Sequence, residues 1–252
     1  MSFIRFSSRR LREMLMKIES AYFSRKGRKD RNDDSVLPLI CSNGTWWAAV
    51  ADGMGGRAGG DIASTAVIDE IKSSIEIRHE ADLSKLFSLA QTHLQTIAKN
   101  NPEWASMGTT LSLISISGRV AEVGHVGDSR IYHLRGDGIV DRTVDQTEVE
   151  QLVQQGVLSR ARARRYPRRH ILLSVLSPSR EYELHKERFE IVEGDRLLLL
   201  TDGVSSKILR REIRDLSLEK SSPQSFCDVL AAEIERRSPQ DDYSAICLDI
   251  HA

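Results

Sequence analysis

Apolar segments alternate with polar turns along most of the chain. The apolar segment 46–51 leads directly into Asp52, and five glycines follow within eight residues. Such a segment is typical of a buried strand, and the glycines indicate backbone that turns sharply or approaches another group closely. A carboxylate at the end of a buried strand is unfavourable unless a cation or a proton compensates its charge. We therefore expect Asp52 to be one of several acids that meet at a metal.

A second apolar segment, 36–40, is separated from this one by Asn43-Gly44. This dipeptide favours a tight hairpin turn, so we expect the two segments to pair as antiparallel strands. The pairing would place Asp34, at the start of the first strand, beside Asp52, at the end of the second.

Residues 1–26 are rich in basic side chains and are expected to form an extension outside the domain. The spacing of Leu11, Met14, Leu15 and Ile18 predicts a short amphipathic helix in this segment. Such a helix would pack on the domain, fray, or contact an anionic membrane surface.

The remaining pattern predicts helices and hairpins rather than a regular βαβ alternation. Helical spacing covers 62–75, 83–97, 147–155 and 226–234, and β-rich segments cover 109–117, 120–126, 129–134, 181–192, 196–201 and 243–250. The segments between 109 and 134 indicate a meander of neighbouring strands. Clustered strands favour an antiparallel α+β fold, with one compact domain over 27–252.

Composition fits a soluble globular protein of 252 residues with no net charge. The balanced charge gives no indication of a nucleic-acid partner. The three cysteines are scattered and form no CxxC motif, which suits a reducing, cytoplasmic location. The chain has neither an apolar run of about 18 residues nor an apolar signal core, so we expect no membrane insertion and no secretion.

Aspartates recur at strand ends and tight turns. There are five such places: Asp33-Asp34, Asp52-Gly53, Gly127-Asp128-Ser129, Asp202-Gly203 and Asp241-Asp242. A single Asp-Gly is an ordinary turn, but five in one domain, without a His or Cys cluster, indicate carboxylate ligation of Mg²⁺ or Mn²⁺ rather than Zn²⁺. Two such ions can clamp a phosphate and activate a bridging water.

The segment Gly53-Met54-Gly55-Gly56-Arg57-Ala58 also matches the glycine pattern of dinucleotide-binding sites. We do not favour that interpretation. Asp52, directly before the turn, would repel a pyrophosphate, and no parallel βαβ pattern surrounds the segment.

Several short motifs together resemble the metal-dependent protein phosphatases, the PPM or type 2C Ser/Thr phosphatases, in their compact bacterial form. The motifs are Asn32-Asp33-Asp34-Ser35, Val50-Ala51-Asp52-Gly53-Met54-Gly55-Gly56, Gly108-Thr109-Thr110, Val126-Gly127-Asp128-Ser129-Arg130, Leu200-Thr201-Asp202-Gly203-Val204 and Asp241-Asp242-Tyr243-Ser244. They occur in the order and spacing of that family, from about Gly27 to the C-terminus.

The resemblance implies a four-layer αββα sandwich, in which helices flank two central antiparallel β-sheets. It also implies that Asp52 bridges two metal ions, that the Gly53 carbonyl binds one of them, and that Asp202 and Asp241 bind the second. Asp34 would act through metal-bound water, and Asp128 matches a ligand of a weaker third ion. Of these residues, Asp34, Asp52 and Asp202 are the expected catalytic ones.

The chain departs from the family pattern where the substrate phosphate is expected to bind. The family usually has an arginine five residues before the position of Asp34, and here Lys29 stands there, with Arg28 and Arg31 nearby. All three are candidates for phosphate binding, because an ammonium does not provide the bidentate fork of a guanidinium. Asp242 replaces the family's usual asparagine, and Ser206 replaces an acid of the animal enzymes.

The function implied by the resemblance is hydrolysis of phosphoserine and phosphothreonine by a metal-bridged water, in opposition to a bacterial Ser/Thr kinase. We expect a monomer that acts on phosphorylated proteins. The alternatives are a non-catalytic sensor or scaffold with the same fold and a hydrolase of small phosphoesters.

The segment 145–180 occupies the place of the family's variable flap. Its basic stretch 160–169 is expected either to recruit acidic or phosphorylated segments or to be a solvated loop.

Overall fold

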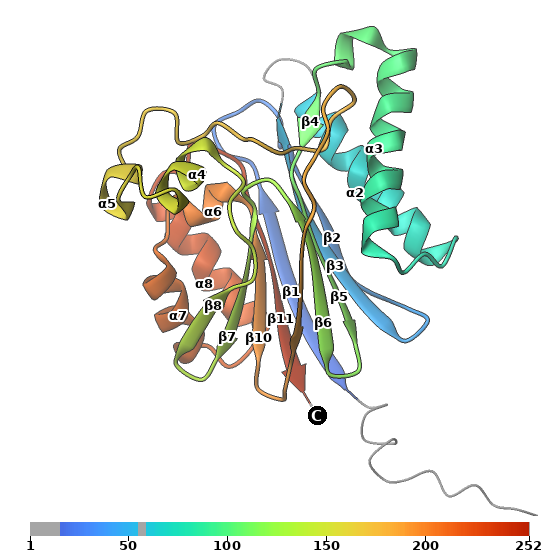
Figure 1. The fold of residues 1–252 in the computed structure, drawn as a ribbon. Helices are drawn as coiled ribbons and strands as arrows, with labels where there is room; N and C mark the ends of the chain where they lie inside the picture. The colour runs from blue at the N-terminus through green and yellow to red at the C-terminus, as the bar shows by residue number, and fades with distance from the viewer. Residues whose placement is uncertain (1–15, 55–58, 252) are drawn as a thin grey trace, which may run out of the picture.

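Two antiparallel sheets pack face to face between two pairs of helices (Figure 1), as the resemblance implies. The structure, a computed structural model, describes residues 16–54 and 59–251. One sheet has the strand order β1-β11-β10-β7-β8, and the other has the order β2-β3-β5-β6-β9, with the short β4 paired to β3. The strands are β1 (Lys17–Arg25), β2 (Asp34–Ser42), β3 (Thr45–Met54), β4 (Gly108–Thr109), β5 (Leu111–Ser117), β6 (Val120–Val126), β7 (Arg130–Arg135), β8 (Gly138–Asp141), β9 (His185–Glu190), β10 (Arg196–Leu200) and β11 (Tyr243–His251).

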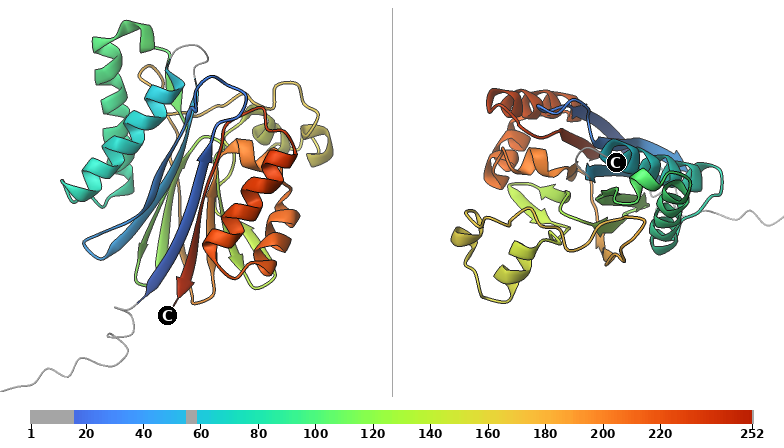
Figure 2. Two further views of the ribbon diagram at one scale, coloured as in Figure 1. Left: turned by 180° about the vertical axis from the view of Figure 1, so that it is seen from behind. Right: turned by 90° about the horizontal axis from the view of Figure 1, so that it is seen from above.

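The helices cover the outer faces of the two sheets (Figure 2). Helices α2 and α3 lie on the β2-β3-β5-β6 side, whereas α7 and α8 lie on the β1-β11-β10 side. Their bounds are α2 (Gly60–Glu76), α3 (Leu83–Asn100), η1 (Pro102–Trp104), α4 (Glu148–Gln154), α5 (Arg160–Ala163), α6 (Asp202–Ser205), α7 (Arg210–Glu219) and α8 (Pro223–Arg236). Within the described ranges, no helix is long and apolar enough to cross a membrane.

Alternating side chains on the central strands divide the core into three layers. Along β3, Ala48 and Val50 face the opposite sheet, whereas Trp47 packs toward α2 and α3. Along β10, Leu197 and Leu199 lie between the sheets, and Leu198 and Leu200 face α8. Because both faces of these strands are buried, their sequences are continuous apolar runs.

The N-terminal boundary expected from the sequence is wrong for residues 17–25. These residues form β1, which pairs with β11 along its whole length, from Lys17 opposite His251 to Arg25 opposite Tyr243. Ile18, expected in a helix, is a buried strand residue. Its expected helical partners Leu11, Met14 and Leu15, like residues 55–58 of the glycine loop, lie outside the described residues. Burial of Ile18 between the sheets, and of Ala21 and Phe23 on the α8 side, favours the extended form.

The expected meander between residues 109 and 134 is only partly correct. Strands β5 and β6 pair with each other, but β7 belongs to the other sheet, between β10 and β8. The chain changes sheets at Gly127-Asp128-Ser129, where Gly127 has a φ of 111°. This crossing places Asp128 between the two sheets at one end of the sandwich.

Candidate active site

The β2–β3 hairpin sets the first two acids side by side. Asn43 and Gly44 form its turn with φ values of 50° and 77°, which is the left-handed geometry that suits Asn-Gly. The resulting register places Asp34 directly opposite Asp52, as the sequence predicts.

Gly53 follows Asp52 where backbone segments meet closely. Its amide donates to the Asp33 carbonyl at 3.0 Å. A Cβ at this position would lie 2.0 Å from the carbonyl oxygen of Gly60 at the start of α2. Only glycine fits here, and this explains why glycine follows the acid directly.

Thr201 holds the end of β10, which leads into Asp202, against Asp34 at the start of β2. The Thr201 hydroxyl donates to Asp34 Oδ2 at 2.8 Å and accepts from the Ser244 amide at 3.0 Å. Asp202 follows at the first position of α6. A Cβ at Gly203 would lie 1.9 Å from the Asp242 carbonyl oxygen, so this glycine lets the 241–242 segment lie against α6.

A pair of threonines fixes the backbone of Asp52. The Asp52 amide donates to the Thr110 hydroxyl at 3.0 Å, and the Asp52 carbonyl accepts from the Thr109 hydroxyl and the Thr110 amide, each at 2.9 Å. Thr110 also contacts the Ser129 hydroxyl at 2.7 Å, next to Asp128. The sequence motif around Gly108 pointed to these threonines but gave them no role.

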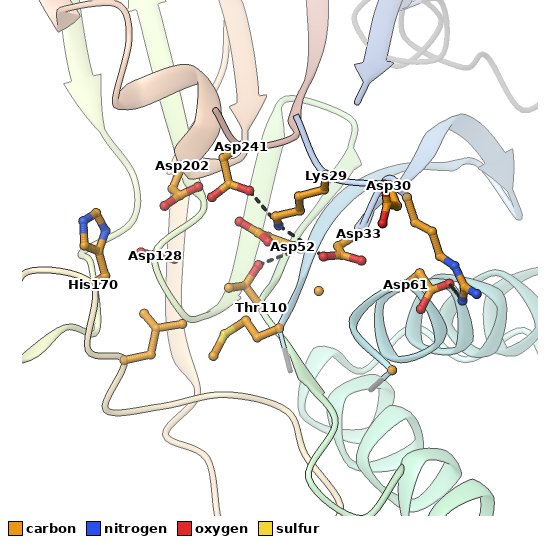
Figure 3. A pocket seen from close by; sticks show the side chains of 15 residues that line it. Lys29, Asp30, Asp33, Asp52, Asp61, Thr110, Asp128, His170, Asp202 and Asp241 are labelled. Carbon is orange, nitrogen blue, oxygen red and sulfur yellow. Dashed lines mark hydrogen bonds and ion pairs between the residues drawn. The ribbon is translucent and has the colours of Figure 1, made fainter. Parts of the chain in front are cut away.

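The acids line one cavity of about 830 Å³. Figure 3 shows Asp52, Asp202 and Asp241 directed toward one another, with Asp128 behind them. The cavity is lined by Lys29, Asp30, Arg31, Asp33, Asp52, Gly53, Met54, Gly59, Asp61, Thr110, Asp128, His170, Leu172, Asp202 and Asp241. Asp34 is buried beside Asp52, and it is not among these lining residues.

The electrostatics of the cavity disfavour this many carboxylates without a counter-charge. Burial raises the pKa of Asp52, and the charges of Asp34 and Asp202 raise it further. The pKa of Asp128 is raised by burial and then by Asp202, and that of Asp202 by burial and then by Asp241. Burial raises the pKa of Asp34 to about 7, although it accepts hydrogen bonds. A bound cation would reverse these shifts.

The donor set fits a hard divalent cation. The Oδ1 atoms of Asp34 and Asp202 are buried and have no hydrogen-bond partner, which leaves them free for a metal or its water. In the described part of the chain, no three His, Cys, Asp or Glu side chains already meet closely enough to hold an ion by themselves. Mg²⁺ and Mn²⁺ are compatible with this arrangement, because such ions retain several waters and take few direct carboxylate ligands.

The three basic candidates for phosphate binding are placed differently from one another. Lys29 Nζ lies 2.7 Å from Asp241, 3.1 Å from Asp33 and 3.5 Å from Asp242. Burial alone would lower the pKa of Lys29, but its contacts with Asp241 and Asp33 raise the pKa above its usual value. Lys29 thus acts as a counter-cation for the acids.

The other two basic candidates have no direct contact with the candidate metal ligands Asp34, Asp52, Asp128, Asp202 and Asp241. Arg31 reaches Asp61 at 3.1 Å on the rim of the cavity, and Arg28 does not line the cavity.

Asp242, which replaces the family's usual asparagine, has a structural role, because its carboxylate accepts from the amides of Gly27 and Asp33, each at 2.8 Å. Among the charged and titratable lining residues, Asp30, Asp61 and His170 were not expected at the site, and Asp33 was expected only as part of the pair Asp33-Asp34.

Comparison with known proteins agrees with this geometry. Residues 24–242 match the family model described as protein phosphatase 2C. A serine/threonine protein phosphatase from Mycobacterium tuberculosis, PstP, is 34% identical over 181 residues, which cover 70% of this chain and 34% of that protein. The chain thus spans about a third of the length of that relative. Protein phosphatase PhpP from Streptococcus pneumoniae is 30% identical over 204 residues, 75% of this chain and 79% of that protein.

Solved structures show the same fold. The crystal structure of the Mycobacterium tuberculosis phosphatase PstP/Ppp superposes with a TM-score of 0.85 at 28% identity, covering 94% of this chain and all of that chain. The PstP catalytic domain in complex with two manganese ions gives a TM-score of 0.82 at 27% identity, with 94% and 100% of the two chains covered. The matched family model, the sequence relatives and the shared sandwich lead to one conclusion: this chain belongs to the protein phosphatase 2C family.

Proposed function

We propose that this protein is a metal-dependent serine/threonine protein phosphatase that uses two Mg²⁺ or Mn²⁺ ions. The observation that carries the proposal is the convergence of Asp52, Asp128, Asp202 and Asp241 on one cavity, from segments far apart in the sequence. Family membership and the two manganese ions named for the PstP catalytic domain support it.

Each acid has a proposed role that follows from its position. Asp52, opposite Asp34 in the hairpin, would bridge both ions, with the Gly53 carbonyl on one of them. Asp202 and Asp241 would hold the second ion, Asp34 would act through water, and Asp128 would serve a third. The unpartnered Oδ1 atoms of Asp34 and Asp202 support their assignment.

When bound, a pair of divalent ions supplies Lewis-acid stabilisation of the phosphoryl oxygens and a water of lowered pKa. The chain's own residues provide the geometry for this chemistry. Thr201 donates to the Asp34 carboxylate at 2.8 Å, and Thr110 fixes the backbone of Asp52 by accepting from its amide at 3.0 Å. This preorganisation keeps the carboxylates from relaxing away from one another, which favours catalysis by reducing reorganisation.

We also propose that the enzyme is a cytoplasmic monomer that acts on phosphorylated proteins and opposes a bacterial Ser/Thr kinase. The names of the relatives and the absence of a disulfide framework in the sequence support this assignment. Arg28, Lys29 and Arg31 remain candidates for phosphate binding. The ion pairs of Lys29 with Asp241 and Asp33 favour Arg31 over Lys29 for direct contact with phosphate.

Hydrolysis of a phosphothreonine peptide tests the proposal. We expect turnover with Mn²⁺ and none with EDTA. Asp202→Asn should lower kcat/KM by at least about a hundredfold, because a metal ligand is lost. The matched control is Asp215→Asn, which removes an exposed carboxylate paired with Arg214 and should leave the rate unchanged. Turnover of nucleotides but not of phosphopeptides would identify a small-phosphoester hydrolase, and lack of all turnover would identify a scaffold.

A further inference from the structure

One segment of this otherwise neutral protein carries basic side chains without any acidic ones. Residues 151–180 contain seven arginines and no aspartate or glutamate, whereas the whole chain has 36 basic and 36 acidic residues. The segment includes the second half of α4 and all of α5, and these helices lie toward the end of the sandwich opposite the C-terminus (Figure 1).

Two of these arginines hold the segment together. Arg160 donates to Glu150 on α4, with one contact at 2.9 Å, and Arg168 donates to Glu148 at 2.7 Å. The Tyr166 hydroxyl donates to the same Glu148 at 2.6 Å. These contacts fix both ends of the basic stretch to one helix, so the stretch is an ordered element rather than a free loop.

Four other arginines are displayed by this element without partners. We call them the flap cluster: Arg162, Arg164, Arg165 and Arg169. All four are exposed, and none of their guanidinium groups has a hydrogen-bond acceptor or an acidic partner among the residues that the structure describes. Backbone bonds from Arg165 to Arg162 and from Arg169 to Tyr166 keep the cluster compact.

The flap cluster is followed directly along the chain by a wall of the catalytic cavity. Arg169 is followed by His170, which lines the cavity, as does Leu172. Figure 3 shows His170 on the side of the cavity occupied by Asp202 and Asp128. Leu172 forms a β-bridge with Thr147 at the start of α4, so this wall of the cavity and the anchored flap are one connected element.

We propose that the flap cluster is a docking surface for aspartate and glutamate side chains that flank the phosphorylated residue of a protein substrate. This inference rests on the proposed phosphatase function and specifies its substrate class. Unpaired guanidinium groups on a segment that continues into the cavity wall can form charge-assisted, often bidentate contacts with carboxylates. They also raise the rate of encounter with an acidic chain, and salt weakens this effect.

The test compares three substrates at low ionic strength: a phosphothreonine peptide with acidic flanks, the same peptide with neutral flanks, and a small aryl phosphate. The variant is Arg164→Gln/Arg165→Gln. The matched control, Arg119→Gln/Arg211→Gln, removes two exposed arginines elsewhere on the surface. Thermal unfolding of both variants verifies that the fold is intact.

We expect the flap variant to lower kcat/KM for the acidic peptide about five- to tenfold, which lies within the range for two exposed ion pairs. The other two substrates should change less than about twofold, and the acidic-peptide effect should vanish in high salt. An equal loss of kcat/KM on all three substrates, or the same loss in the control variant, would contradict the proposed docking surface and leave the phosphatase function intact. If no substrate is turned over at all, the proposed function itself fails.

Discussion

Asp34 and Asp52 face each other across the β2–β3 pair, and the hydroxyl of Thr201, from the other sheet, donates to Asp34 at 2.8 Å. One hydrogen bond therefore connects an acid of one sheet to Thr201, which follows β10 of the other sheet and directly precedes Asp202. Because the acids of this site come from both sheets, their spacing depends on how the two sheets are held together at this end of the sandwich.

Replacing this threonine tests the connection. Thr201→Val keeps the shape but leaves the Ser244 amide and one Asp34 oxygen without their partner. We expect a loss of about 1–3 kcal/mol in the free energy of unfolding, measured by urea denaturation, and a fall in kcat. The control is Thr143→Val, a buried threonine whose hydroxyl accepts from the Ile131 amide at 3.1 Å. Thr143→Val should lose similar stability and keep its kcat. A fall in kcat for both variants would show that any loss of a buried threonine hydroxyl lowers kcat, whether or not it contacts Asp34.

Gly53→Ala should distort the site directly. The added methyl would lie 2.0 Å from the Gly60 carbonyl oxygen, so the β3 end and the α2 start must separate. We expect destabilisation of at least about 1–3 kcal/mol and a weakened Mn²⁺ affinity, measured by thermal unfolding and calorimetry. The control is Gly138→Ala at the exposed start of β8, where the nearest atom would be 3.2 Å away and Mn²⁺ affinity should not change. Unaltered Mn²⁺ affinity in Gly53→Ala would contradict the assigned geometry.

Lys29→Met separates the role of a counter-cation from that of a phosphate ligand. Lys29 contacts Asp33, Asp241 and Asp242, and its side chain is about one-third exposed. Removing its charge should destabilise the metal-free protein by about 1 kcal/mol and tighten Mn²⁺ binding, since the acids lose a competing cation. Lys26→Met, in the same segment, should change neither quantity. A large rise in KM for a small aryl phosphate, with unchanged Mn²⁺ affinity, would instead identify Lys29 as the phosphate ligand.

His125 predicts a specific pH dependence of stability. Burial lowers its pKa from 6.5 to about 4, and its Nδ1 lies 2.8 Å from the Ser112 hydroxyl. The unfolded chain therefore binds one more proton as pH falls below 6.5, and stability is lost progressively down to pH 4. The loss from this group amounts to about 3 kcal/mol.

The pH effect is measured by comparing urea unfolding at pH 7 and pH 5. His125→Asn should remove this component of the pH dependence, whereas His79→Asn, at an exposed position, should retain it. Identical pH slopes in the wild-type protein and His125→Asn would contradict a neutral buried imidazole.

The parts of the fold that the sequence predicted are those with a local signal. Asn43-Gly44 between two apolar segments predicted the β2–β3 hairpin, and helical spacing predicted α3. Strand β1 is an edge strand of mixed composition, so only its pairing with β11 decides its conformation. Helix α7 was not predicted because Ile213 is its single buried residue. The crossing of β7 to the other sheet has no local signal either.

In the site too, the residues with a local sequence signal were predicted and the others were not. The acids at strand ends were found from the sequence, because each follows or enters an apolar segment. The pairing of Lys29 with Asp241 depends on two loops that approach each other only in the folded protein. His170 lines the cavity from the end of a basic stretch, and nothing in its sequence neighbourhood indicates that position.

The central claim is that acids distant in the sequence together hold a pair of divalent ions. Anomalous diffraction from a crystal soaked in Mn²⁺ tests it most directly. We predict two peaks in the cavity, with Asp52 between them and with Asp202 and Asp241 beside one of them. A cavity without an anomalous peak, or manganese bound only at other acids, would contradict the account.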